Sequence, residues 1–115
     1  MCGWHSNVSY YKYAWIGVSP NISCRCHAQA ISPNGNYAID AVVTVIAHEL
    51  TEAATDPLGT GWYGYNYIET GDQCAWYFPN SYKLASGASY NLVVSGNKYF
   101  VQANWNLNSE ACTMS

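Results

Sequence analysis

Charged side chains are scarce in this chain. Four Lys or Arg and seven Asp or Glu among 115 residues give a formal net charge of −3. So few basic residues exclude the positive surface with which proteins bind nucleic acid. No apolar run reaches the roughly 20 residues that a membrane-spanning helix needs. The paired Cys-x-x-Cys spacing of a zinc ribbon is also missing.

Apolar and aromatic residues are abundant. Half of the residues are apolar and 16% are aromatic, including eleven Tyr and five Trp. The length fits one domain over residues 1–115, and the apolar fraction is ample for one core. The aromatic residues exceed what the core of so small a domain can hold, so some of them are expected to face outward. Exposed Tyr and Trp rings stack on sugars or form protein interfaces, including self-association.

The cysteine count is odd. The five are Cys2, Cys24, Cys26, Cys74 and Cys112. Dispersed cysteines, with little Lys or Glu and much Asn, Ser, Gly and Tyr, indicate a secreted, extracellular protein. Cys24 and Cys26 stand too close together for an easy mutual disulfide, so each is expected to bond a distant partner, with the pairing open. Two sequons, beginning at Asn7 and Asn21, would permit glycosylation in a eukaryotic secretory route.

One helix dominates the expected secondary structure. Residues 10–18 are aromatic and β-prone and predict a strand, and residues 19–36 predict a loop. The helix is expected over 37–55, capped by Asn34 or Asn36 and ended by Asp56 before proline. Its centre is apolar almost all round, which predicts burial.

Residues 88–94 and 98–105 flank Ser95-Gly96-Asn97 and predict a mostly buried C-terminal hairpin. The fold class is therefore α+β, with one buried central helix packed on an antiparallel β-sheet. A zincin-like arrangement is the more specific hypothesis for this class.

A line of polar residues follows one face of the expected helix. Its members recur every four residues and are Asp40, Thr44, His48, Glu52 and Asp56. Residues 48–52 read His-Glu-Leu-Thr-Glu, which is one residue away from the H-E-x-x-H zinc motif. A His and a carboxylate at i and i+4 can ligate one zinc ion, and Glu49 could act as general base on a metal-bound water.

A third ligand should come from elsewhere in the chain. Asp72 and Glu69 follow the motif by about 20 residues, and His5 and His27 are further candidates. The predicted metal ligands are therefore His48, Glu52, Asp72 and His5. Calcium is an alternative, since Asp56, Glu69 and Asp72 supply oxygen ligands. In the competing structural interpretation, His48 and Glu52 are hydrogen-bonded core residues.

The order of several segments resembles the EXORDIUM/phosphate-induced protein family. They are Cys2-Gly3-Trp4-His5, Tyr13-Ala14-Trp15-Ile16-Gly17, the 24/26 cysteine pair, Ser32-Pro33-Asn34-Gly35, Asp40-Ala41-Val42, residues 48–52, Asp56-Pro57, Gly71-Asp72-Gln73-Cys74, Ala88-Ser89-Tyr90-Asn91, Lys98-Tyr99-Phe100-Val101-Gln102, Asn104-Trp105 and Ala111-Cys112. The resemblance spans nearly the whole chain. It corresponds to the C-terminal part of such proteins and is stronger to microbial members with an intact H-E-x-x-E.

The resemblance implies a protein secreted to the apoplast or cell wall, with a cell-wall glycan or a peptide as possible substrate. Members usually carry one more cysteine shortly before Cys2. We therefore expect Cys2 to be unpaired here and the chain to be part of a longer precursor. The functional hypothesis is a secreted metallohydrolase acting on peptide or amide bonds. The alternative is a non-catalytic glycan-binding or self-assembling wall protein that uses its Tyr and Trp surface, since several plant members lack the His-Glu pair.

Overall fold

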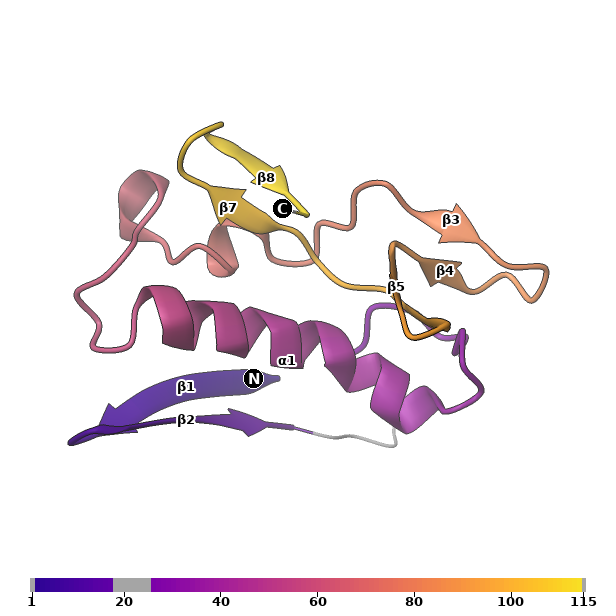
Figure 1. The fold of residues 1–115 in the computed structure, drawn as a ribbon, viewed down its shortest axis with the longest axis horizontal. Coiled ribbons are helices and arrows are strands. Elements are labelled where there is room, and N and C mark those ends of the chain that lie inside the picture. The colour runs from indigo at the N-terminus through magenta and orange to yellow at the C-terminus, as the bar shows by residue number, and fades with distance from the viewer. Residues whose placement is uncertain (1, 18–25, 115) are drawn as a thin grey trace.

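The computed structural model describes residues 2–17 and 26–114. A long helix, α1 (Tyr37–Thr55), runs through the middle of the molecule. An N-terminal β-ribbon lies along one side of it, and the C-terminal half of the chain lies along the other (Figure 1). The helix therefore separates two layers that do not share a sheet. Within the described residues, no helix combines the length and the apolar character needed to cross a bilayer.

The predicted bounds of α1 are confirmed. The side chain of Asn36 caps the first turn by accepting a hydrogen bond from the Ile39 N–H at 3.3 Å. At the other end, Asp56 leaves the helical region because it precedes Pro57. The backbone N–H of Asp56 still reaches the Glu52 carbonyl at 2.6 Å.

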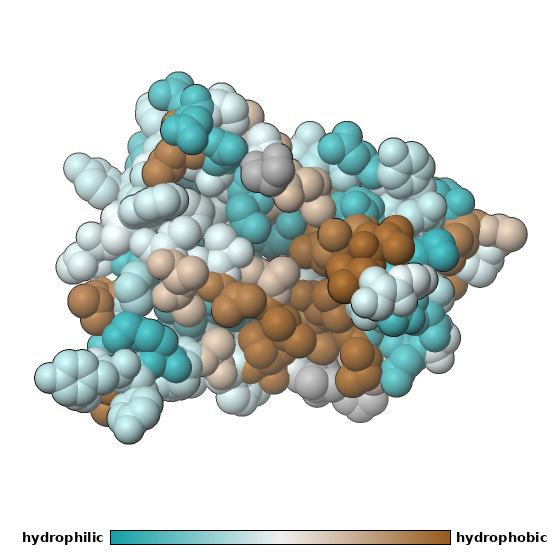
Figure 2. Space-filling model, in the orientation of Figure 1, coloured by the Kyte–Doolittle hydropathy of each residue, from teal (hydrophilic) through white to brown (hydrophobic). Residues whose placement is uncertain are grey.

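The prediction that α1 is buried all round holds for only part of its surface. Its buried apolar residues are Ala41, Val42 and Val45, whereas Ile39, Ile46 and Leu50 are exposed. Figure 2 shows hydrophobic residues gathered over the N-terminal half of α1 and the neighbouring β5. The buried surface of the helix is thus mixed, because Thr44, Glu49 and Glu52 are as buried as its apolar residues.

The N-terminal ribbon consists of β1 (Gly3–Val8) and β2 (Tyr11–Ile16), paired antiparallel. The strand predicted over 10–18 is thus β2, and residue 18 lies outside the described part. No strand was predicted over the residues of β1, which carries His5. Because β1 and β2 both contact α1, they bring His5 to the polar face of the helix.

Two disulfides join distant segments, Cys2–Cys26 and Cys74–Cys112. The expectation that Cys2 is unpaired is wrong. The Gly17 N–H donates to the Cys2 carbonyl at 2.8 Å, so the chain leaving β2 starts beside Cys2 and returns to it at Cys26. Cys24 and Asn21 lie outside the described residues.

The C-terminal half forms short separate ribbons instead of the single predicted sheet. The antiparallel pairs are β3 (Tyr82–Lys83) with β4 (Ser89–Tyr90), β5 (Leu92–Val94) with β6 (Asn97–Tyr99), and β7 (Asn104–Asn106) with β8 (Ala111–Thr113). Two 3-10 turns precede them, η2 (Tyr65–Tyr67) and η3 (Asp72–Cys74).

The predicted C-terminal hairpin exists but is shorter than expected. Ser95 and Gly96 both have positive φ and form the two-residue turn between β5 and β6. Beyond Tyr99 the chain leaves this ribbon, and residues 104–106 pair with β8 instead. The apolar residues of β5 are exposed, so the prediction of a mostly buried ribbon is wrong there.

Candidate metal centre

Polar side chains fill much of the space between α1 and the layers beside it. The buried polar or charged residues are Thr44, Glu49, Glu52, Asp56, Thr70 and Gln102. Glu49 is 4% exposed and Glu52 is 3% exposed, although both are carboxylic acids. Burying a carboxylate is costly unless a cation or several donors compensate it. The contacts of these two residues therefore decide what the site can do.

The ends of the polar line have structural roles. Asp40 accepts hydrogen bonds from the Ser32 hydroxyl at 2.5 Å and from the Asn34 side chain at 2.8 Å, which fastens the preceding loop. Asp56 accepts from the Gly61 N–H at 2.6 Å and holds the turn after the helix. Burial would raise the pKa of Asp56, but the hydrogen bond from Tyr63 and those from the backbone keep it lowered.

The centre of the line forms a first group with η3. His48 Nε2 lies 3.2 Å from Glu52 Oε1 and 3.3 Å from Asp72 Oδ1. The Asp72 N–H donates to Glu52 Oε1 at 3.0 Å, which fixes η3 against the helix. The ligand atoms of His48, Glu52 and Asp72 all lie within 4.8 Å of one another. Three of the four predicted metal ligands thus converge.

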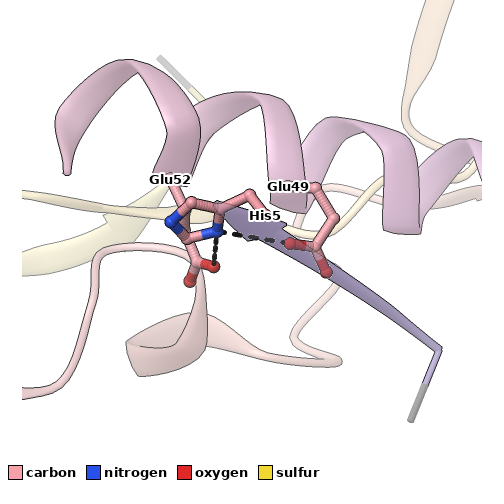
Figure 3. A group of neighbouring side chains, drawn as sticks. All are labelled: His5, Glu49 and Glu52. Carbon is pink, nitrogen blue, oxygen red and sulfur yellow. Dashed lines mark hydrogen bonds and ion pairs between the residues drawn. The ribbon is translucent and has the colours of Figure 1, made fainter. Parts of the chain in front are cut away.

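The fourth predicted ligand, His5, lies in a second group on the other side of Glu52. Figure 3 shows the ring of His5 between the carboxylates of Glu49 and Glu52. His5 Nδ1 is 3.4 Å from Glu49 Oε2 and 3.4 Å from Glu52 Oε2. The other ring nitrogen, Nε2, is 3.4 Å from Glu69 Oε1. These atoms of His5, Glu49 and Glu52 also lie within 4.8 Å of one another, so Glu52 belongs to both groups.

Negative charge dominates this pair of groups and shifts several pKa values. Burial opposes a charged ring at His48, but the hydrogen bond and charge of Glu52, with Glu49 and Asp72, raise the pKa of His48 to about 9. Burial, opposed by the charge of His48, raises the pKa of Glu49. Burial and the Glu52 charge raise the pKa of Glu69 to about 7. The site holds more carboxylates than its histidines can balance, which favours a cation.

A cleft leads to the first group. It measures about 190 Å³, and His48, Asp72, Trp76 and Gln102 are among the residues that line it. Glu52 is buried beneath it and does not line it. A cation held by the first group would therefore be open to solvent on one side, as a catalytic zinc requires.

Sequence reasoning missed Gln102. This side chain is 4% exposed, and its Nε2 donates to the Gly71 carbonyl at 3.0 Å, beside Asp72. Its backbone N–H donates to Thr44 Oγ1 at 3.0 Å, which links the segment between β6 and β7 to α1. The signal in the sequence was the single amide side chain of Gln102 within the otherwise apolar or aromatic residues 99–103.

His27 and the predicted calcium ligands form no further group within the part of the chain that the structure describes. His27 packs beside Tyr37, with ring centroids 5.8 Å apart. The three residues of the predicted calcium set do not form a common group among the described residues, because Asp72 joins His48 while Asp56 caps the helix. Glu69 instead contacts His5.

The expectation that some aromatic residues face outward is confirmed. Tyr10, Tyr11, Tyr65 and Tyr67 are more than two-thirds exposed, and Trp62 is 58% exposed. Tyr10 and Tyr11 lie in the N-terminal ribbon, at its turn and at the start of β2, whereas Trp62, Tyr65 and Tyr67 follow α1. Exposed aromatic surface therefore occurs at separate places in the molecule.

Comparison with known proteins places the chain among plant relatives. It is 29% identical over 145 residues to Protein EXORDIUM-like 3 of Arabidopsis thaliana, covering 98% of this chain and 43% of that protein. It is 30% identical over 148 residues to Protein EXORDIUM-like 5 of the same plant, covering 98% of this chain and 41% of that protein. The chain thus spans about two-fifths of the length of these relatives. No solved structure gives a significant match.

A family model described as the phosphate-induced protein 1 conserved region matches residues 1–115. The match includes the helix with its H-E-x-x-E residues, the segment of His5 and the segment of Asp72. The chain belongs to the phosphate-induced protein family, whose EXORDIUM-like members include these two plant proteins.

Proposed function

We propose that this chain is a secreted, zinc-dependent hydrolase that acts on peptide or amide bonds, with zinc held by His48, Glu52 and Asp72. The observation that carries the proposal is the spacing of the three ligand atoms. Ligands about 2.0–2.1 Å from a tetrahedral zinc ion stand roughly 3.3 Å apart. His48 Nε2 is 3.2 Å from Glu52 Oε1 and 3.3 Å from Asp72 Oδ1.

The chemistry of the ligands also favours zinc over calcium. Imidazole nitrogen is an ordinary zinc ligand, whereas calcium takes six to eight oxygen ligands. When bound, zinc would acidify a water molecule and polarise a carbonyl group. The cleft beside His48 and Asp72 gives water and substrate access. The two disulfides support secretion, because disulfides persist in oxidising compartments.

Glu49 is the proposed general base, and His5 is the proposed positioning residue. Glu49 is buried and adjoins the His48 ligand in sequence, and burial raises the pKa of its carboxyl, which makes the carboxylate a stronger base. His5 contacts both Glu49 and Glu52, so its ring holds the base and one ligand in a fixed relation. The Cys2–Cys26 disulfide anchors the strand of His5 three residues away.

Elemental analysis of the folded, disulfide-intact chain tests the metal site. We expect one zinc per chain, and loss of zinc in Glu52→Gln and in Asp72→Asn. The Asp72 side chain is 56% exposed, so Asp72→Asn tests the metal site without disturbing the core. Glu110→Gln, an exposed acid in the β7–β8 turn, is the matched control and should keep the metal. A folded protein that binds no stoichiometric zinc would overturn the proposal.

A second measurement separates binding from catalysis. Glu49→Gln should retain zinc but lose about 10²- to 10⁴-fold of a chelator-sensitive peptidase activity. Equal zinc content and equal activity in wild type and variant would remove Glu49 from the mechanism. Activity that survives complete zinc removal would refute the hydrolase proposal itself.

A further inference from the structure

A second hollow lies away from the metal centre, between the loop after α1 and the β7–β8 ribbon. It measures about 530 Å³, within the range of small-molecule and cofactor sites. We call it the Trp groove. The lining residues used below are Trp62, Asn104, Trp105, Asn106, Asn108 and Thr113.

Two tryptophans of the Trp groove have firmly held backbones. The Trp62 N–H donates to the Thr55 carbonyl at the end of α1, at 3.0 Å. The Trp105 N–H donates to the Thr70 carbonyl at 2.9 Å, and Trp105 pairs with Cys112 across the ribbon. Cys112 is in turn bonded to Cys74. Because these contacts fix the backbones that carry the two tryptophans, a ligand would lose little affinity to ordering the backbone of the groove.

The polar part of the lining consists of carboxamides and a hydroxyl group. The carboxamides of Asn104 and Asn108 each carry donor and acceptor groups. The Asn106 Oδ1 instead accepts from the backbone N–H groups of Asn108 and Ser109, at 2.9 and 3.2 Å, and shapes the turn between β7 and β8. The buried Asn104 Oδ1 has no hydrogen-bond partner in the described part of the chain. Groups that both donate and accept suit the adjacent hydroxyls of a sugar, and flat indole faces suit the apolar face of its ring.

The charge of the groove narrows the class of ligand. None of the described residues that line it is ionisable. Binding to polyanions such as nucleic acids or acidic polysaccharides depends on basic side chains. A second hollow of about 530 Å³ shares Trp105 and Leu107 and is lined further by Tyr63, Tyr65 and the acid Glu110, which would also disfavour an anionic ligand. The aromatic surface thus continues past one pocket, which suits a chain of several sugar units.

From these features we propose that the Trp groove binds a neutral oligosaccharide, with the ring of Trp62 as an exposed stacking platform and the carboxamides of Asn104 and Asn108 as hydroxyl-binding groups. This site is separate from the metal centre and does not depend on the proposed hydrolase activity. It would allow the chain to attach to a neutral polysaccharide whether or not it is an enzyme.

An oligosaccharide array tests the proposal on the full, disulfide-intact chain. It carries neutral oligomers of glucose, mannose, galactose, xylose and N-acetylglucosamine, with oligogalacturonate as the anionic arm. A proline-rich peptide is included, because such peptides also dock in aromatic grooves. We expect saturable binding to at least one neutral series, confirmed in solution by a change in tryptophan fluorescence.

Substitutions then locate the binding. Trp62→Ala should weaken it about tenfold or more, because it removes the aromatic face on which a sugar ring would stack. Tyr82→Ala, an aromatic residue 63% exposed in β3, is the matched control and should bind as wild type does. Trp105→Phe keeps a ring in the partly buried position and should weaken binding less than Trp62→Ala.

The proposal is overturned if no neutral series binds, if the anionic oligomer or the peptide binds in preference, or if Tyr82→Ala matches Trp62→Ala. A chelator distinguishes the two proposals. Removing metal should leave oligosaccharide binding unchanged, so failure of the zinc site and failure of the groove give different results.

Discussion

The raised pKa of His48 makes the stability of the metal-free protein depend on pH. The pKa rises from 6.5 to about 9 because of the hydrogen bond and negative charges around the ring, despite its burial. A shift of this size corresponds to about 3 kcal/mol at 1.36 kcal/mol per unit, and solvent screening at the partly exposed ring reduces it to about 2 kcal/mol. Since the folded-state pKa lies above the unfolded value, this stability is fully present below 6.5. It is lost as the pH rises through 9.

Urea unfolding in the presence of a chelator measures the effect. We expect wild type to lose about 2 kcal/mol more than His48→Gln between about pH 6 and about pH 9.5. Gln keeps a side-chain amide near Glu52 and does not titrate, so the difference between the two proteins isolates His48 from other titrating groups. Parallel pH profiles for the two proteins would refute the charged pairing of His48 with Glu52 and Asp72.

Three further predictions follow from the same contacts. Replacing both cysteines of the Cys74–Cys112 bond, which are 38 residues apart, by serine should lower the free energy of unfolding by about 4 kcal/mol in urea, with Cys2–Cys26 left intact. Thr44→Val removes the acceptor of the buried Gln102 N–H and should cost about 1–3 kcal/mol in urea unfolding, whereas an unchanged midpoint would contradict that bond. Zinc at a hundredfold excess over its dissociation constant should stabilise the wild type by about 2.7 kcal/mol in thermal unfolding, and Glu52→Gln should show no such gain.

The helix and its polar line were predictable because they depend on local rules. Asn36 and Asp56 mark the ends of α1 by capping and by proline sterics, which involve only neighbouring residues. The helical period alone puts His48 and Glu52 on one face. The fold class and the outward-facing tyrosines followed from composition and pattern in the same way.

The sheet arrangement was not predictable in this way. The strands at 92–94 and 104–106 are only three residues long, too short for their composition to specify a partner, and the turn that follows each of them sets its pairing. Ser95-Gly96 closes one ribbon locally, while β7 pairs forward to β8. The Cys2–Cys26 bond likewise joins residues 24 positions apart, and the odd cysteine count with the extra cysteine of family members gave the wrong expectation for Cys2.

By itself, the sequence determined the family, the central helix and the pair His48 and Glu52, since each rests on residue order or on a local period. Only the tertiary structure decided which distant residues meet that pair. Asp72, at the start of η3, lies against the ring of His48. His5, on β1, lies against Glu52 from the opposite side. The physical reason is that a carboxylate has two oxygens, and the packing of two separate layers on α1 directs one oxygen to each histidine.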